Sequence, residues 1–188
     1  MSKIITPEFR ASYVNVFTPR TTMDGKEEKY SISMIFPKTT DLSKLKKASA
    51  DCAIAKWGED KKKWPKNLRS PFRDGDTDRS EDPVYANSIF INVSSKNRPG
   101  LVDKDLQPII DPREFYSGCY AQASLSCFAY EKAGNRGVSF GLNNLMKTRD
   151  GESLGGAISK PEEDFAELAV QDAVKGDPEL SPQEIEFF

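Results

Sequence analysis

Residues 119–130 read CYAQASLSCFAY, and their side chains alternate between two chemical types along the chain. The odd positions are small or apolar, namely Cys119, Ala121, Ala123, Leu125, Cys127 and Ala129. The even positions are polar or aromatic, namely Tyr120, Gln122, Ser124, Ser126, Phe128 and Tyr130. A period of two is typical of a β-strand with one buried face. The small residues of the odd face favour the tight interior of a small barrel.

The even face of this strand carries three aromatic rings among polar side chains, whereas an ordinary exposed strand face favours Lys, Glu and Thr. Exposed rings stack on nucleic-acid bases, at about 1–3 kcal/mol per base. Two alternatives are that a helix or a subunit partner covers this face. The pattern predicts base stacking by Tyr120, Phe128 and Tyr130, together with Tyr116 just upstream.

Alternation of the same kind predicts further strands at 9–17, 29–36, 84–93 and 138–142. In the first of these, Phe9, Ala11 and Tyr13 fall on one face. A turn containing Asp24-Gly25 joins the first two strands into a hairpin. Residues 143–149 read as a short turn or helix.

One clear helix is expected at residues 41–57, where Leu42, Leu45 and Cys52 recur at helical spacing. Asp41 is suited to cap its start, and Gly58 to end it. Residues 1–149 therefore predict a mainly β domain, a small antiparallel barrel of five or six strands with one inserted helix.

Charge divides the chain near residue 150. Residues 150–188 contain 11 Asp and Glu against two Lys, whereas residues 1–149 contain 25 basic and 18 acidic residues, a net charge of +7. We expect a domain at 1–150 and an acidic C-terminal tail at 151–188, mostly disordered with a short helix at 161–174. A basic body with an acidic appendage is a feature of nucleic-acid-binding proteins, although an ordinary surface with a solvated tail is the alternative.

Composition excludes several classes of function. The 188 residues contain no His, which excludes Ser-His-Asp triads, Cys-His dyads and His-ligated zinc. Three cysteines without a C-x-x-C pair argue against a disulfide framework or a zinc site. No phosphate-binding loop is present. We therefore expect no enzyme activity, no cofactor and no metal. The enzyme alternative is a metal-dependent nuclease around Asp74, Asp76 and Asp78, although these residues fail the EF-hand pattern.

Basic residues in the expected loops are the second candidate for binding. Several lie beside an aromatic residue or a turn glycine, as in Phe72-Arg73 and Arg98-Pro99-Gly100. A basic groove with interleaved rings follows phosphates and stacks bases without reading sequence, whereas each charge taken singly is an ordinary surface residue. The loop residues predicted to contact nucleic acid are Arg20, Trp64, Arg73, Arg98, Lys147 and Arg149.

The segment 182–188 reads PQEIEFF. Its rings are suited to a partner's pocket while its carboxylates steer toward basic residues. We therefore expect Glu184, Glu186, Phe187 and Phe188 to bind a partner, or to fold back and compete with nucleic acid. The alternative is a phenylalanine packed against the tail's own helix.

Four segments resemble the tailed-phage single-stranded-DNA-binding proteins, namely Pro19-Arg20-Thr21, Arg98-Pro99-Gly100, residues 115–120 (FYSGCY) and residues 137–145 (GVSFGLNNL) followed by Lys147, Arg149, Asp150 and Gly151. The resemblance covers about residues 5–157. It implies an OB-fold, sequence-independent binding to single strands and a dispensable acidic tail. A standard OB-fold places its helix after the third strand, whereas here the expected helix follows the second.

We therefore expect a single-stranded-DNA-binding protein that protects DNA in phage replication or recombination, in the cytoplasm of the bacterial host. Its tail modulates DNA binding or recruits replication proteins. A homodimer or a cooperative assembly on DNA stays open. No apolar stretch reaches the roughly 20 residues of a membrane span, so no membrane partner is expected. The alternative function is a phage structural or interaction module that uses the aromatic strand face as a protein interface.

Overall fold

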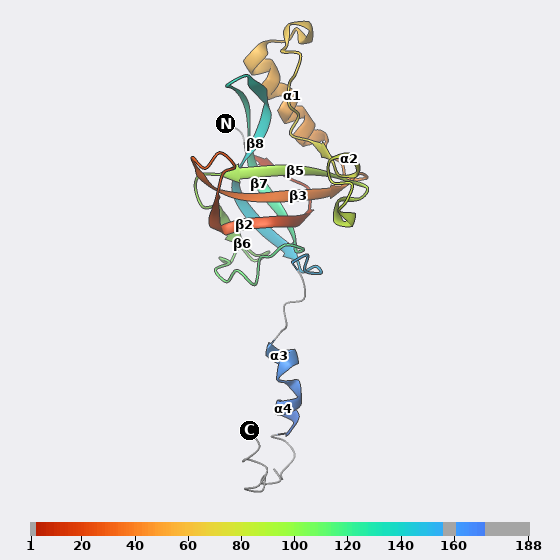
Figure 1. The fold of residues 1–188 in the computed structure, drawn as a ribbon, viewed down its shortest axis with the longest axis vertical. Helices are drawn as coiled ribbons and strands as arrows, with labels where there is room; N and C mark the ends of the chain where they lie inside the picture. The colour runs from red at the N-terminus through yellow and green to blue at the C-terminus, as the bar shows by residue number, and fades with distance from the viewer. Residues whose placement is uncertain (1–2, 156–160, 172–188) are drawn as a thin grey trace. The chain divides into compact units, whose positions relative to one another are not determined.

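Five long strands close into a ring in the computed structural model, which describes residues 3–155 and 161–171 (Figure 1). They are β2 (Phe9–Thr21), β3 (Glu28–Pro37), β5 (Ser88–Ser95), β7 (Tyr120–Lys132) and β8 (Asn135–Arg149). Their order is β7-β2-β3-β5-β8, and pairing of β7 with β8 closes the ring. This is an OB-fold-like barrel. The barrel was expected to be antiparallel throughout, and this needs correction, because β5 and β8 pair in parallel through Ser94 and Gly141.

Three short strands extend the ring, namely β1 (Ile4–Ile5) on β7, β4 (Arg73–Asp74) on β5 and β6 (Gly100–Val102) on β8. The expected turn or helix at 143–149 is wrong. These residues belong to β8, whose pairing with β7 continues as far as Tyr120 opposite Arg149. The strand expected at 84–93 begins only at Ser88, because residues 83–85 form the short helix η2 (Pro83–Tyr85).

The barrel interior is filled by the inward-facing residues of the ring strands. On β7 and just before it, the predicted alternation is confirmed, because Cys119, Ala121, Ala123 and Leu125 are buried. The small side chains of this strand leave room for large ones opposite, and the largest buried side chains of this core include Phe9, Phe36, Phe115 and Phe140.

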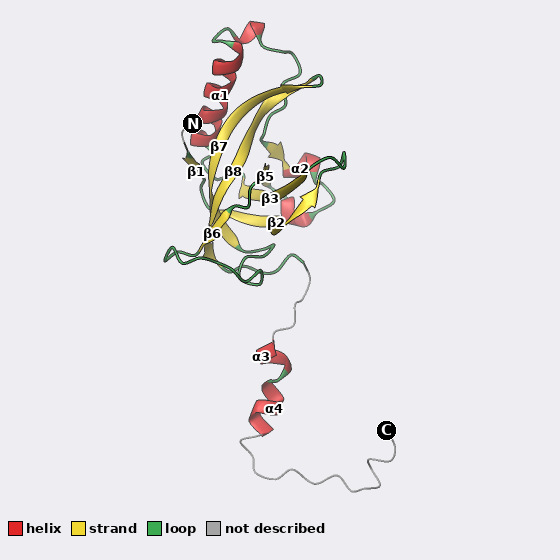
Figure 2. Ribbon diagram, turned by 90° about the vertical axis from the view of Figure 1, so that its left-hand side faces the viewer, coloured by secondary structure: helices red, strands yellow, loops and turns green. Residues whose placement is uncertain are grey.

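Helix α1 (Ser43–Trp57) follows the second ring strand, as the sequence predicts. The helix begins two residues later than expected, with Leu42 and not Asp41 at the N-cap position; Asp41 lies one residue earlier, and its carboxylate accepts a hydrogen bond from the Ser43 N–H at 2.9 Å. Gly58 ends the helix with φ of 87°. Figure 2 shows α1 alongside the β7–β8 hairpin. Its Cys52 meets Cys127 of the odd β7 face. The helix therefore does not cover the even face, where Phe128 remains 40% exposed.

The chain divides into two units, residues 1–155 and 156–188. In the second, α3 (Pro161–Asp164) and α4 (Ala166–Gln171) occupy the range of the predicted helix at 161–174, whose last three residues lie outside the described part. The predicted tail contacts Glu184, Glu186, Phe187 and Phe188 also lie outside it. None of the helices in the described part combines the length and the hydropathy that a membrane span requires.

Candidate nucleic-acid interface

Three adjoining hollows run across the outside of β2, β3 and β5 and continue to the β7–β8 hairpin; we call them together the trough. Their volumes are about 330, 280 and 540 Å³. Tyr13 lines both the first and the second hollow, and Asn92 lines both the second and the third. Because neighbouring hollows share a wall residue, the three hollows lie side by side across the strands of the ring.

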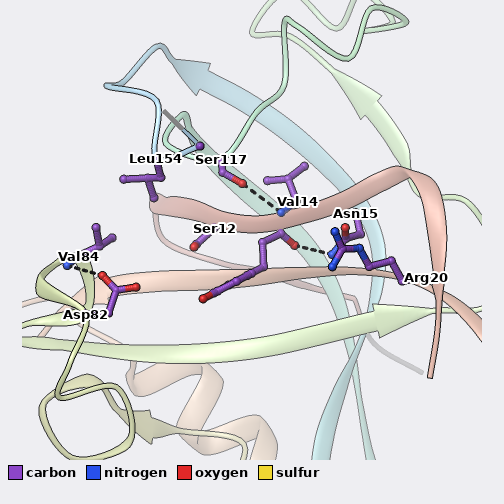
Figure 3. A pocket seen from close by; sticks show the side chains of 10 residues that line it. Ser12, Val14, Asn15, Arg20, Asp82, Val84, Ser117 and Leu154 are labelled. Carbon is purple, nitrogen blue, oxygen red and sulfur yellow. Dashed lines mark hydrogen bonds between the residues drawn. The ribbon is translucent and has the colours of Figure 1, made fainter. Parts of the chain in front are cut away.

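The first hollow lies against β2 (Figure 3). Asn15 and Arg20 of β2 border it at one end and Asp82 and Val84 at the other, while Ser117 lies beside Val14. The Ser117 hydroxyl accepts a hydrogen bond from the Val14 N–H at 3.2 Å, which ties the loop before β7 to β2. The Asn15 side chain donates to the Tyr13 carbonyl at 3.1 Å. These contacts fix the backbone on both sides of Tyr13.

Small polar side chains form the floor of the second hollow. Ser31 pairs with Ser94 and Ser33 pairs with Asn92 across β3 and β5, and all four line the hollow. They alternate with core residues such as Met34 and Ile91, so the strand period of two places them on the outer face of the sheet. Ser33 is itself buried, and its hydroxyl accepts a hydrogen bond from the Tyr85 hydroxyl at 3.2 Å. The short side chains of Ser31, Asn92 and Ser94 allow a base or a sugar to approach the sheet closely while offering hydrogen bonds to it.

Tyr13 is the aromatic residue of the trough that the sequence pattern misplaced. It was expected to share a face with Phe9 and Ala11, which are buried, but its side chain is 51% exposed. The register between β2 and β3 shifts between Ser12 and Asn15, and Tyr13 has φ of 46°. A bulge of this kind interrupts the alternation and turns one side chain to the other face. Strained backbone of this type is found most often at functional sites.

Arg79 lies over Tyr13, with its guanidinium carbon 5.3 Å from the ring centroid. Helix α2 (Gly75–Asp78) positions it, because the Arg79 N–H donates to the Gly75 carbonyl at 3.1 Å. The guanidinium also contacts the buried rings of Tyr85 and Phe90, at 5.7 and 6.0 Å. Those rings pack edge to face and cover one end of the β3–β5 face. A rigid aromatic base therefore holds a cation beside the exposed tyrosine.

The long polar excursion between α1 and β5 supplies the third hollow. It runs beside β8, where the Arg69 N–H donates to the Arg136 carbonyl at 2.9 Å and the Arg69 carbonyl accepts from Val138 at 3.2 Å. Arg69, Arg73 and Tyr130 line the hollow. The rings of Tyr130 and Phe128 are 6.5 Å apart, so two predicted stacking residues of β7 meet at this end of the trough.

The trough is lined by more cations than carboxylates, with Arg20, Arg69, Arg73 and Arg79 against Asp78 and Asp82. Within residues 3–155 and 161–171, Arg20, Arg69 and Arg79 form no ion pair. Arg73 differs, because its guanidinium contacts the Asp78 carboxylate at 3.3 Å while it lies 5.1 Å from the Phe90 ring. Of the residues predicted from the sequence, the structure brings together Arg20, Arg73 and Tyr130 with Phe128 beside them, and it adds Tyr13, Arg69, Arg79 and Asn92.

Four other predicted residues form a separate cluster at the start of β7 and the end of β8, and none of them lines the trough; they are Tyr116, Tyr120, Lys147 and Arg149. Arg149 lies 3.7 Å from the Tyr120 ring centroid and pairs with Glu8 at 3.0 Å. Hydrogen bonds from Thr148 and Arg149 lower the pKa of the Glu8 carboxyl. The Tyr120 ring and the Arg149 guanidinium thus each have a partner within the protein, and their contact with nucleic acid stays a prediction.

Lys147 and Tyr116, the other two residues of this cluster, also have partners within the protein. Lys147 pairs with Asp150 at 2.6 Å and lies 5.4 Å from the Tyr116 ring. The Tyr116 hydroxyl donates to the Gly151 carbonyl at 2.8 Å, and burial raises the pKa of this tyrosine. Tyr116 therefore fastens the segment that follows β8 onto the barrel.

Trp64 and Arg98 also lie apart from the trough lining. The Trp64 indole N–H donates to the Gly58 carbonyl at 2.8 Å, which holds the ring against the end of α1. Arg98 lies 5.8 Å from the Phe17 ring on β2. Their predicted contacts with nucleic acid stay predictions.

The aspartates proposed as a nuclease site are held by cations of the protein itself. Lys38 pairs with Asp76 at 2.6 Å and with Asp74 at 3.1 Å, and the hydrogen bond from Lys38 lowers the pKa of Asp76. Asp78 pairs with Arg73. In the described part of the chain, no group of three or more His, Cys, Asp or Glu side chains is arranged to hold a metal ion.

Comparison with known structures supports the fold. The single-stranded DNA-binding protein of bacteriophage Enc34, solved in complex with single-stranded DNA, superimposes with a TM-score of 0.69 at 24% identity over 81% of this chain and 89% of that one. Gp2.5 of bacteriophage T7, a single-stranded DNA-binding protein, gives a TM-score of 0.59 at 10% identity over 85% of this chain and 98% of its own.

Sequence comparison identifies the family. Protein p50 of Acyrthosiphon pisum secondary endosymbiont phage 1 is 32% identical over 179 residues, covering 89% of this chain and 95% of the relative. Residues 2–175 match the family described as the ssDNA-binding protein of Enterobacter phage Enc34, a family of binding proteins and not of enzymes. Because that match spans nearly the whole sequence, this chain belongs to the phage single-stranded-DNA-binding protein family represented by Enterobacter phage Enc34.

Proposed function

We propose that this protein binds single-stranded DNA along the trough, without reading sequence, and protects it during phage replication or recombination in the host cytoplasm. The observation that carries the proposal is the arrangement of Tyr13 and Tyr130 in adjoining hollows with Arg20, Arg69 and Arg79, which form no ion pair with any residue of the described part. Rings stack on any base and arginines hold phosphates, so this combination binds single strands of any sequence.

Titration of a labelled oligo-dT strand, followed by fluorescence anisotropy across a salt series, tests this function. A duplex of the same length is the comparison. We expect tight binding to the single strand that weakens as salt rises, and weaker binding to the duplex, whose paired bases are not free to stack on the tyrosines. Absence of binding at low salt, with residues 160–188 removed as well, would overturn the proposal and leave the trough as a protein interface.

The Arg73–Asp78 ion pair predicts a substitution that strengthens DNA binding. Asp78→Asn removes the carboxylate that holds Arg73, and the freed guanidinium then pairs with a phosphate at less cost. Exposed ion pairs contribute about 0.2–1 kcal/mol, so we expect oligo-dT affinity to rise by up to about fivefold at low salt. Asp111→Asn is the matched control, because Asp111 pairs with Arg113 and neither residue lines the trough. Weaker binding by Asp78→Asn would contradict the role given to Arg73.

We also infer that the acidic tail weakens DNA binding, and that its acidic aromatic segment at 182–188 recruits replication or recombination proteins. Deleting residues 160–188 removes nine carboxylates and two lysines. We therefore expect the truncated protein to bind oligo-dT more tightly at low salt, with the difference shrinking as salt screens the charges. A full-length variant with the nine acids changed to Asn or Gln should match the truncation. Equal affinity of the wild type and both variants at low salt would exclude competition by the tail.

A further inference from the structure

A second groove, separate from the trough, lies between α1, β1 and β7. It has a volume of about 610 Å³ and shares no lining residue with the three hollows of the trough. Ile5, Ala48 and Cys52 contribute its apolar surface, and Lys3, Lys44 and Lys47 border it. We call it the α1 groove.

The α1 groove presents an apolar surface that the described residues leave open. Ala48, Cys52 and Ala55 follow one another at helical spacing along α1, so they lie on one face, and their small side chains leave depth above the helix. Ile5 is 58% exposed. Of the three bordering lysines, only Lys47 forms an ion pair within the described part, with Asp51 at 2.7 Å.

The second unit carries a surface of the opposite charge. Phe165 and Leu168 are 59% and 57% exposed, and they are three residues apart, so they share one side of a helical turn. The residues around them include Glu162, Asp164 and Glu167. Residues 161–171 span about 16 Å when helical, which is shorter than the about 22 Å of α1. An apolar pair with acidic neighbours therefore complements an apolar groove with a lysine border in charge and polarity, and the segment is no longer than the helix that forms one wall of the groove.

We propose that the α3–α4 segment of one copy docks in the α1 groove of a second copy. Phe165 and Leu168 cover the apolar floor, and the acidic side chains face Lys3 and Lys44. The contact joins two different surfaces, so it allows one copy after another to be added along a strand. An eleven-residue segment buries too little surface for a stable dimer in solution, but DNA holds neighbouring copies at high local concentration. The proposal thus rests on the proposed function, and it assigns the contact that makes binding cooperative.

Cross-linking on DNA tests the contact directly. Full-length protein labelled with ¹⁵N is mixed with unlabelled protein on long poly-dT, and a zero-length carbodiimide joins lysines to carboxylates in contact. We expect mass spectrometry to find links from Lys3 or Lys44 to Glu162 or Glu167 in pairs of mixed isotope composition. Links found only in pairs of one composition would place the contact within a single chain and overturn the proposal. Absence of these links would overturn it as well.

Variants test the consequence for binding. Phe165→Ser with Leu168→Ser should leave affinity for a short oligo-dT unchanged and lower cooperativity on long poly-dT by about tenfold. Ile110→Ser, at a residue that is 78% exposed in a loop of the first unit, is the matched control and should change neither the short-strand affinity nor the cooperativity. Lys44→Glu should repeat the loss, and adding Glu167→Lys should restore cooperativity.

The two strand lengths separate the two proposals. Binding of the wild type to the short strand reports the proposed function by itself, whereas the ratio between long and short strands reports docking. Unchanged cooperativity in the Phe165→Ser, Leu168→Ser variant would overturn the docking proposal even where short-strand binding is intact.

Discussion

Replacing Tyr13 with alanine is expected to weaken binding to oligo-dT by about 5- to 150-fold, the equivalent of about 1–3 kcal/mol for one stacked base. Tyr13→Phe should retain most of the affinity, because the ring and not the hydroxyl stacks. Thermal stability should change little, since the side chain is 51% exposed. Anisotropy titrations at one salt concentration measure the affinities, and a thermal melt of each variant checks the fold.

Tyr120→Ala is the matched comparison for Tyr13→Ala. Both positions carry a tyrosine on the outside of the barrel. The aromatic ring of Tyr120, however, is covered by Arg149, whose guanidinium carbon lies 3.7 Å from the ring centroid, and Tyr120 does not line the trough. We therefore expect a much smaller loss from Tyr120→Ala. A large loss from Tyr120→Ala with none from Tyr13→Ala would move the DNA to the cluster at the start of β7.

The second large effect is expected from Arg69→Gln combined with Arg79→Gln. Each cation lines the trough without an ion pair among the described residues, so both are available to phosphates. Each phosphate contact on a single strand contributes about 0.7 to the slope of log affinity against log salt. The double variant should lower that slope by about 1.4 and weaken binding most at low salt.

Arg149→Gln is the control for this double variant. Its guanidinium is paired with Glu8 at 3.0 Å, so it has little to offer a phosphate, and the slope should stay at the wild-type value. Lysine at positions 69 and 79 should restore most of the slope, because the charge is kept. An unchanged slope in the Arg69→Gln, Arg79→Gln variant would exclude these arginines as phosphate contacts.

The strand pattern in the sequence predicted the barrel because its physical cause is local. Alternation along 119–130 places Cys119, Ala121 and Ala123 inside, and the structure confirms them as buried. The helix position was also predictable, since Gly58 and the spacing of Leu42 and Leu45 mark it. The parallel pairing of Ser94 with Gly141 was not, because it depends on how distant strands meet when the ring closes.

The candidate site was only partly predictable, for two separate reasons. The outward position of Tyr13 was not predicted because a bulge breaks the period of two, and bulges leave no reliable mark in a single sequence. The position of Arg79 in the trough was not predicted because it depends on the rings of Tyr85 and Phe90, which a sequence does not show to be neighbours. The ion pair between Arg149 and Glu8 was also not predictable, because the two residues lie at opposite ends of the domain in sequence.

Ultraviolet cross-linking of the full-length protein to oligo-dT, followed by mass spectrometry of the linked peptides, tests most directly whether DNA lies in the trough. Thymine links to the aromatic rings that it stacks on, so fragmentation of the peptides should place the links on Tyr13 and Tyr130, and Tyr13→Ala should abolish the first of these links. Assignment to single residues is needed because no Lys or Arg separates Tyr116, Tyr120 and Tyr130. Links confined to Tyr116 and Tyr120 would contradict the account and place the strand at the other end of β7.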